Sequence, residues 1–218
     1  MARDLEVSTT EDIDVDLDAP DQHQLAGGAR RGLALLLAIG GAVGLLAAFV
    51  LAVERIALLK DPDYVPTCSF NPVLSCGSVM QTWQAEAFGF PNPLIGIAGF
   101  AVVTTVGVVL SARATLPRWF WIGLEAGALL GIAFVHWLIY QSLYSIGALC
   151  PYCMVVWVVT VPIFWYLTVH NLQAGHLPAP AGLRRFVVRN RALILTGWFL
   201  AVAALILARF WDYWTSLV

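Results

Sequence analysis

Five stretches of about 20 mainly apolar residues constrain the fold of this chain more than any other feature. A helix of about 20 residues crosses the roughly 30 Å of hydrocarbon in a bilayer, so each stretch can span a membrane. With 60% hydrophobic and 12% charged residues among 218, the chain carries more apolar surface than a soluble domain of this size can bury. We therefore predict an all-α integral membrane protein that contacts a lipid bilayer and no nucleic acid. The predicted spans are Gly32 to Val53, Pro93 to Ala112, Trp119 to Ile139, Cys150 to Val169 and Ala192 to Trp211.

Acidic residues are concentrated before the first predicted span. Residues 1–29 contain no aromatic side chain and no apolar periodicity that could bury a face, which is typical of a disordered segment. We predict a disordered acidic cytoplasmic tail over 1–29, either a solubilising segment or a docking tail. A cleaved signal peptide is not expected, because no basic region precedes a short apolar core. Eight of the fourteen carboxylates lie in the first thirty residues: Asp4, Glu6, Glu11, Asp12, Asp14, Asp16, Asp18 and Asp21.

The positions of arginine and lysine predict the orientation, because short cytoplasmic loops carry an excess of these residues. With a cytoplasmic N-terminus, nine of the twelve basic residues lie inside and three outside. This orientation places the 54–92 loop, the 140–149 turn and the C-terminus on the outer face. The inner residues are Arg3, Arg30, Arg31, Arg113, Arg118, Arg184, Arg185, Arg189 and Arg191, and the outer ones are Arg55, Lys60 and Arg209.

The four cysteines form two pairs, which this orientation puts together on the extracytoplasmic side, where disulfides persist. Cys68 and Cys76 lie in the outer loop, and Cys150 and Cys153 form a C-x-x-C motif at the start of the fourth predicted span. The N–H groups and the dipole of a helix N-terminus stabilise a thiolate, which makes such a cysteine both an attacking and a leaving group. Pro151 suits an early helical position, where its missing N–H costs nothing. The pattern favours electron transfer between the two pairs.

Two other interpretations of the cysteines remain open from the residues alone. A static disulfide between Cys150 and Cys153 would close a short loop and add little stability. A non-catalytic membrane scaffold with structural disulfides is the corresponding alternative function. A tetrahedral zinc site requires four ligands, but the seven residues between Cys68 and Cys76 exceed the usual spacing of a zinc knuckle. We predict no metal site.

The order of several motifs matches a known pattern. The C-x7-C pair follows the first span, Thr82 lies six positions beyond Cys76, Asn92 and Gly96 open the second span, and C-x-x-C starts the fourth. This order resembles the vitamin K epoxide reductase family over roughly residues 32–170. The resemblance implies a four-helix transmembrane bundle around a quinone pocket, and the fifth predicted transmembrane helix lies outside the region that it covers. The implied divisions are a catalytic core over 30–170, a basic cytoplasmic loop over 171–191 and a fifth helix over 192–218.

The resemblance implies a role for each cysteine. Cys153 resembles the cysteine that faces the quinone, and Cys150 resembles the one that exchanges with the loop. Cys76 resembles the loop cysteine that attacks Cys150, and Cys68 the one that meets the thiol of a partner protein. The implied sequence is a relay of thiol–disulfide exchanges.

Three further residues match family positions near the quinone head. Thr82 and Asn92 are two of these, with the asparagine as a hydrogen-bond donor to a quinone oxygen. Animal members have a tyrosine four residues after the second cysteine of the C-x-x-C motif, where this chain has Trp157. An indole can stack on a quinone ring but offers only an N–H, so quinone choice or inhibitor sensitivity can differ.

We predict from the resemblance a membrane thiol:quinone oxidoreductase. The chain contains no G-x-G-x-x-G or C-x-x-C-H motif for another redox cofactor. Many bacterial members carry a fused thioredoxin-like domain that this chain lacks, so a separate thioredoxin-like (DsbA-like) extracytoplasmic protein is the expected partner. Electrons would pass to a menaquinone- or ubiquinone-type quinone in a bacterial plasma membrane, supporting disulfide formation in exported proteins. The alternative within the family is reduction of a quinone or epoxide to supply hydroquinone. A four-span enzyme of the disulfide-bond formation protein B type is disfavoured, because there the C-x-x-C pair precedes the loop pair.

Other polar residues receive weaker interpretations. Glu125 lies about 10 Å along a helix axis from Arg118, so we expect a local polar contact far from the cysteines. His136, near the outer end of the third span, is expected to be a satisfied polar residue or, alternatively, to pass a proton to the quinone. His170 and His176 are expected in the inner loop.

The segment from Ser78 to Phe88 predicts a short helix in the outer loop. Val79, Met80, Trp83 and Phe88 would lie near one side of it. Such a helix would lie in the membrane interface over the mouth of the bundle.

Overall fold

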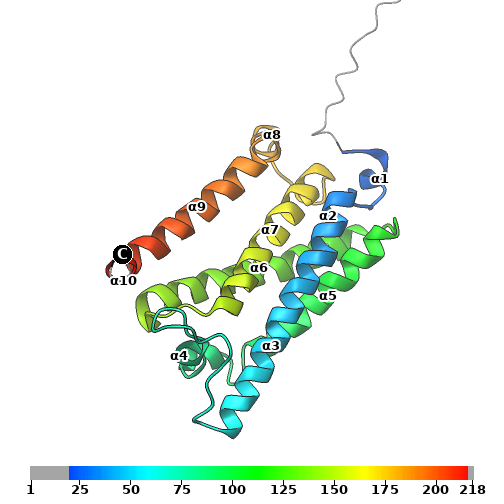
Figure 1. The fold of residues 1–218 in the computed structure, drawn as a ribbon. Coiled ribbons are helices and arrows are strands. Elements are labelled where there is room, and N and C mark those ends of the chain that lie inside the picture. The colour runs from blue at the N-terminus through cyan, green and yellow to red at the C-terminus, as the bar shows by residue number, and fades with distance from the viewer. Residues whose placement is uncertain (1–19, 216–218) are drawn as a thin grey trace, which may run out of the picture.

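The computed structural model describes residues 20–215, and its long helices form a bundle (Figure 1). Within these described residues, five helical segments are long and apolar enough to cross a membrane, which confirms the predicted all-α membrane fold. The spans are Arg31–Lys60 (α2, Arg31–Leu35; a π-helical turn η1, Leu36–Gly40; and α3, Gly41–Lys60), α5 (Pro93–Ser111), Arg118–Ile146 (α6, Arg118–Tyr140, and π-helical η3, Gln141–Ile146), α7 (Pro151–Gln173) and α9 (Arg191–Arg209). The short elements are α1 (Gln22–Leu25), α4 (Cys76–Met80), the 3-10 helix η2 (Trp83–Glu86), α8 (Ala181–Arg189) and α10 (Trp211–Thr215).

The first four spans pack as one bundle. The first span contacts α5 and α7, and α6 contacts α7. Small residues allow the first span and α5 to approach closely, as is common between membrane helices. A Cβ atom on Gly107 would collide with the backbone nitrogen of Ala38. The buried side chains between these helices include Leu37, Leu110, Trp121 and Leu167.

The fifth span lies beside the bundle. None of the residues of α9 is buried. Figure 1 shows α9 running alongside α7, with α8 and α10 at its two ends. Hydrogen bonds attach it to α7, α6 and η3, in that order: Trp165 Nε1 to the Arg191 carbonyl (2.8 Å), Trp198 Nε1 to His136 Nε2 (2.9 Å) and Arg209 Nε to the Leu143 carbonyl (2.7 Å).

Two spans extend further at the cysteine end than predicted. The first continues past Val53 to Lys60, so the outer loop begins after Lys60 rather than at residue 54. The helix can continue because its next two residues, Glu54 and Arg55, are both paired with loop residues. The third span continues to Ile146 and shortens the predicted 140–149 turn. Gly147, at a left-handed φ of 70°, ends it.

The single helix predicted between Ser78 and Phe88 is wrong. The structure has two short helices there, α4 and η2, and the chain between them is extended at Thr82. Met80 is buried, but the aromatic side chains of Trp83 and Phe88 are exposed. The outer loop between α3 and α5, called the cap below, is therefore irregular rather than one amphipathic helix, and it covers the mouth of the bundle.

The predicted disorder of residues 1–29 is wrong for the part that the structure describes. Residues 20–29 include α1, capped by Asp21, and they pack on the bundle. The Gly27 carbonyl accepts hydrogen bonds from Trp121 Nε1 (3.1 Å) and the Leu116 N–H (2.9 Å). Backbone contacts of this kind leave no apolar pattern in the sequence, which explains why the prediction missed them. Residues 1–19 lie outside the described residues.

Candidate active site

A short backbone pairing brings the two cysteine segments together. The Ser75 N–H donates to the Leu149 carbonyl (2.9 Å), and the Leu149 N–H donates to the Val73 carbonyl (2.7 Å). These bonds form an isolated parallel bridge between the outer loop and the segment before α7. Because Cys76 follows Ser75 and Cys150 follows Leu149, the bridge places the two cysteines side by side.

The sulfur atoms at this junction are arranged for exchange. Cys68 and Cys76 form a disulfide, whereas Cys150 and Cys153 are thiols. The Sγ atoms of Cys76 and Cys150 are 3.0 Å apart. Cys68, Cys76 and Cys150 are all buried, in one cluster with Leu51, Leu58 and Met80. A thiolate at Cys150 would have the Cys76 sulfur directly beside it.

The C-x-x-C motif lies where the sequence predicts, at the N-terminus of α7. Cys150 is the N-cap residue and its sulfur accepts a hydrogen bond from the Cys153 N–H (3.4 Å). Pro151 occupies the first turn. Backbone N–H groups directed at a sulfur stabilise its thiolate form, so the local structure suits Cys150 for exchange chemistry.

Cys153 faces a large apolar cavity of about 880 Å³. The side chains that line it come mainly from α3, α5, α6 and α7, with the outer cap closing one end. Trp157, one helical turn after Cys153, also lines the cavity and is almost fully buried. Within the part of the chain that the structure describes, its Nε1–H has no hydrogen-bond partner. A buried donor without an acceptor is costly, and an oxygen atom of a ligand in the cavity would satisfy it.

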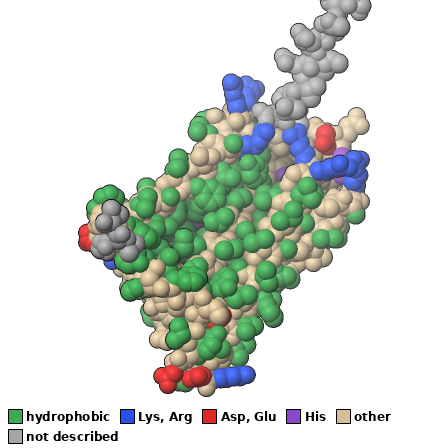
Figure 2. Space-filling view, viewed as in Figure 1, with side chains coloured by type: hydrophobic (Ala, Val, Ile, Leu, Met, Phe, Trp, Pro, Cys, Tyr) green, Lys and Arg blue, Asp and Glu red, His purple; other side chains and the backbone are tan. Residues whose placement is uncertain are grey.

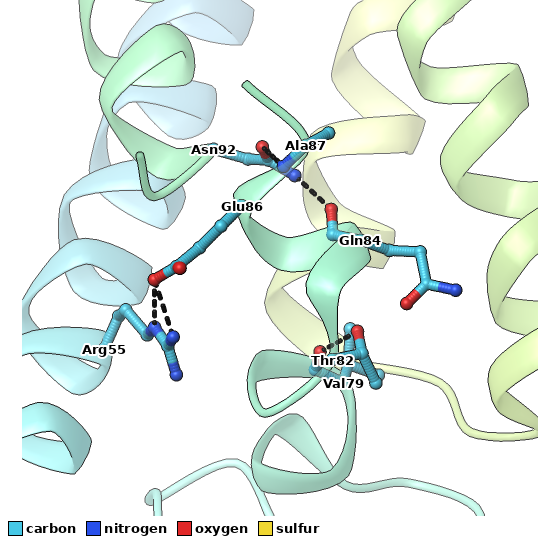
Figure 3. Close-up of polar contacts among 7 residues, drawn as sticks. All are labelled: Arg55, Val79, Thr82, Gln84, Glu86, Ala87 and Asn92. Carbon is cyan, nitrogen blue, oxygen red and sulfur yellow. Dashed lines mark hydrogen bonds and ion pairs between the residues drawn. The ribbon is translucent and has the colours of Figure 1, made fainter. Parts of the chain in front are cut away.

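Asn92 lines the same cavity and also holds the cap in place (Figure 3). Its side-chain N–H donates to the Gln84 carbonyl (2.6 Å), and its side-chain oxygen accepts from the Ala87 N–H (3.2 Å). The Gln84 side chain is buried and donates to Gln141 and Ser145. The amide of Asn92 therefore has a structural partner on each side, with one further N–H available as a donor.

Thr82 does not reach the cavity, contrary to the sequence prediction. It is not among the lining residues. Its hydroxyl donates to the Val79 carbonyl at 2.7 Å, within the turn that links α4 to η2 (Figure 3). The helical break at this position turns the side chain back on its own segment.

Charged residues missed by the sequence analysis hold the outer loop to α3. Arg55, which lines the cavity, forms an ion pair with Glu86 of η2 at 2.6 Å (Figure 3). Glu54 is buried, and its carboxylate accepts hydrogen bonds from the Thr67 hydroxyl (2.6 Å) and N–H (3.4 Å). A hydrogen bond with Glu54 also raises the pKa of Tyr64. Glu54 thus fixes the residues directly before Cys68. Its signal in the sequence was a lone carboxylate at the end of an apolar span.

Glu125 and His136, the two ionisable residues noted within the third predicted span, lie away from the cysteines. Glu125 accepts from Thr168 (2.6 Å) and Asn171 (2.9 Å), the local polar contact that was predicted. His136 does not line the cavity, and both of its ring nitrogens are occupied. The backbone carbonyl of Ile132 can only accept, so Nδ1 carries the proton and Nε2 accepts from Trp198. This arrangement favours the interpretation of His136 as a satisfied polar residue over its interpretation as a proton donor to the quinone.

Of the two inner histidines, His176 lies in the inner connection as predicted, whereas His170 does not. His170 belongs to the last turn of α7 and is buried, whereas His176 lies in the turn that follows. Burial and the neighbouring Arg118 lower the pKa of His176. Neither residue lines the cavity beside Cys153.

Three of the cysteine sulfurs are close enough to be considered as metal ligands. The Sγ atoms of Cys68, Cys76 and Cys150 lie within 4.8 Å of one another. Zinc binds thiolates, however, and two of these sulfurs are joined in a disulfide. In this state Cys68 and Cys76 therefore offer no thiolate to a metal ion.

Comparison with known proteins agrees with the motif order. The model of the vitamin K epoxide reductase family matches residues 35–168. No curated protein matches the chain. The matched segment contains both cysteine pairs and the cavity-lining helices, whereas α8 and α9 lie outside it.

The sulfur geometry predicts which cysteines can pair. In the double variant Cys68→Ala/Cys153→Ala, mild oxidation should join Cys76 and Cys150, because their sulfurs already lie 3.0 Å apart. Intact mass and thiol counting under denaturing, non-reducing conditions measure the product. The control Cys68→Ala/Cys150→Ala should keep both of its thiols under the same conditions. Equal oxidation of the two variants would contradict the assignment.

The buried contact of Glu54 predicts a stability difference. Glu54→Ala should lower the free energy of unfolding by about 1–3 kcal/mol, because it leaves the Thr67 donors without an acceptor. Glu86→Ala removes a more exposed ion pair and should cost about 0–1 kcal/mol. Thermal or denaturant unfolding of both variants in one detergent makes the comparison. A larger loss of unfolding free energy in Glu86→Ala than in Glu54→Ala would contradict the proposed role of Glu54 in fixing the residues before Cys68.

Proposed function

The chain belongs to the vitamin K epoxide reductase family, and on this premise we propose that it is a thiol:quinone oxidoreductase that reoxidises a separate thioredoxin-like (DsbA-like) protein. The family assignment makes the chain a quinone-linked membrane oxidoreductase. The specific proposal rests on one observation, the 3.0 Å approach of Cys76 to Cys150 beside a cavity that Cys153 lines. This arrangement connects a loop disulfide to an apolar pocket through adjacent sulfur atoms.

The proposed relay begins at the loop. A thiolate of the reduced partner attacks Cys68 and forms a mixed disulfide, and Cys76 leaves as a thiolate. The second thiol of the partner resolves the mixed disulfide and releases Cys68. The partner is then oxidised to its disulfide, and the Cys68–Cys76 disulfide is reduced to two thiols.

The second half of the relay moves these electrons inward. Cys76 attacks Cys150 of an oxidised Cys150–Cys153 pair, and Cys153 leaves as a thiolate. Cys68 then attacks Cys76, re-forms the loop disulfide and releases Cys150. The product is an oxidised loop beside a reduced C-x-x-C pair, the same redox state as in the structure. The alternative of a non-catalytic membrane scaffold requires two static structural disulfides, and it is disfavoured because Cys150 and Cys153 are not bonded.

The cavity supplies a suitable place for the acceptor. A quinone bound there would take up two electrons and two protons while Cys150 and Cys153 form their disulfide, which returns the inner pair to the oxidised state that Cys76 attacks. Trp157 would donate its unsatisfied Nε1–H to a quinone oxygen, and Asn92 would donate the N–H that the cap does not use. The apolar lining suits a menaquinone- or ubiquinone-type ring that enters from lipid. The hydroquinone-supplying alternative would use the same residues with the same direction of electron flow.

The proposed location is a bacterial plasma membrane, with a cytoplasmic N-terminus and the redox site outside. The bias of nine basic residues against three supports this orientation. Both cysteine pairs lie at one end of the bundle, and an oxidising compartment at that end suits their chemistry.

Dithiol-driven quinone reduction tests the relay. With dithiothreitol as donor, the purified protein in detergent should reduce a soluble quinone, and Cys153→Ala should lower the rate at least about 100-fold. Cys76→Ala should keep this activity, because the small dithiol reaches the inner pair directly, but lose activity driven by a thioredoxin-like donor. Loss of the dithiothreitol-driven rate in a folded Cys76→Ala protein would show that the assigned relay order is wrong.

The unsatisfied indole predicts a specific change in quinone use. Trp157→Phe keeps an aromatic ring but removes the N–H, so the KM for quinone should rise about two- to tenfold. The rate of exchange with the loop disulfide should not change. Trp165→Phe is the matched control, because this indole donates to the Arg191 carbonyl away from the cavity. An unchanged KM in Trp157→Phe would remove its N–H from the quinone site.

A further inference from the structure

A second cavity lies at the end of the bundle opposite the cysteines. It has a volume of about 430 Å³ and is bounded by the first span, α7 and the start of α9. Its lining divides by chemistry into two parts. Leu33, Leu36 and Val169 provide an apolar surface, and Arg30 and Arg191 provide positive charge.

Hydrogen bonds around this cavity determine which ring nitrogen of neutral His170 carries the proton. Arg30 Nε donates to Gln24 Oε1 at 2.8 Å, which fixes the orientation of the Gln24 amide. The amide nitrogen of Gln24 then faces His170 Nδ1 at 3.3 Å and donates to it. Neutral His170 must therefore carry its proton on Nε2. That atom is buried and has no hydrogen-bond partner among residues 20–215, so the site contains a donor that requires an acceptor.

The charged side chains that line the cavity are all basic, although the Asp21 carboxylate lies near enough to act electrostatically on His170. Arg30 precedes α2 and Arg191 begins α9, so the two guanidinium groups come from separate elements. None of the lining residues, all within the described part of the chain, is Asp or Glu. Figure 2 shows further Lys and Arg side chains gathered at this end of the molecule, above the apolar surface of the helices. The cavity is thus cationic on its polar side and apolar on the side that continues into the bundle.

We propose that this cavity binds an anionic phospholipid, with its phosphate between Arg30 and Arg191 and its first acyl carbons against Leu33, Leu36 and Val169. Guanidinium groups bind phosphate oxygens strongly, and basic pockets between membrane helices suit anionic headgroups. The ends of three spans meet here, so the cavity lies at the depth of a headgroup. Such a lipid would bridge the first span to α9, a membrane-spanning helix that has no buried residue of its own. The proposal is independent of the redox function.

Thermal unfolding of the full chain in a neutral detergent, with short-chain lipids added, tests the proposal. Dioctanoyl phosphatidylglycerol should raise the unfolding midpoint in a saturable manner, and dioctanoyl phosphatidylcholine should not. Inorganic phosphate should protect much less than phosphatidylglycerol, because it lacks the acyl part. Equal protection by inorganic phosphate would identify a soluble anion as the ligand and overturn the lipid assignment.

Three variants localise the effect. Arg191→Gln should weaken the apparent affinity for phosphatidylglycerol about fivefold, the value expected for one arginine. Arg184→Gln, an exposed arginine of α8 outside the cavity, is the matched control and should change it little. Gly32→Phe should abolish saturable protection while keeping both arginines, because Gly32 lines the cavity and a Cβ there meets no atom within 4 Å.

Several outcomes would overturn the proposal. Equal losses in Arg191→Gln and Arg184→Gln would indicate a general attraction of anionic lipid to a basic surface. Saturable protection that survives in a folded Gly32→Phe protein would place the lipid elsewhere. Protection that appears only after removal of residues 1–19 would identify the acidic N-terminal segment of the chain as the occupant instead.

Discussion

The pairing of the backbone at residues 73–75 with Leu149 is the constraint on which the redox site depends. Cys76 and Cys150 are 74 positions apart in the chain, and two spans of the bundle separate them. Two backbone hydrogen bonds are enough to align the segments, because each of these cysteines directly follows a residue of the bridge. The disulfide to Cys68 and the helix start at Pro151 then orient the sulfurs. The relay geometry is therefore a property of the loop–helix junction rather than of the helices alone.

Buried polar residues give this junction its rigidity. The cap between α3 and α5 has little regular structure, so local backbone turns and side-chain contacts together hold it in place. The side chains of Glu54 and Asn92 bond to groups of the cap, the Gln84 side chain ties the cap to η3, and each of the three is at least partly withdrawn from water. Where water is scarce, an unpaired donor costs more than it would in a soluble loop. The same contacts that order the cap also close one end of the cavity that Cys153 and Trp157 line.

The two ends of the bundle use polar residues for different purposes. At the cysteine end, Trp157 remains without a partner beside an apolar cavity, as a ligand site requires. At the other end, Glu125, Asn171 and His176 form a connected chain of hydrogen bonds, which ties α6 to α7 and the following turn. A carboxylate inside a membrane span thus serves packing here.

Local patterns in the sequence determined the number of spans, the all-α fold and the position of the C-x-x-C motif at a helix start, since hydrophobic length and helix-terminus chemistry act over a few residues. The order of the motifs also identified the family. Only the tertiary structure decided that Thr82 turns away from the cavity, that Glu54 clamps the loop and that residues 20–29 pack on Trp121. Each of these depends on contacts between distant segments. Because lipid and bundle core both favour apolar side chains, the periodicity within a span does not reveal which face packs and which residues meet.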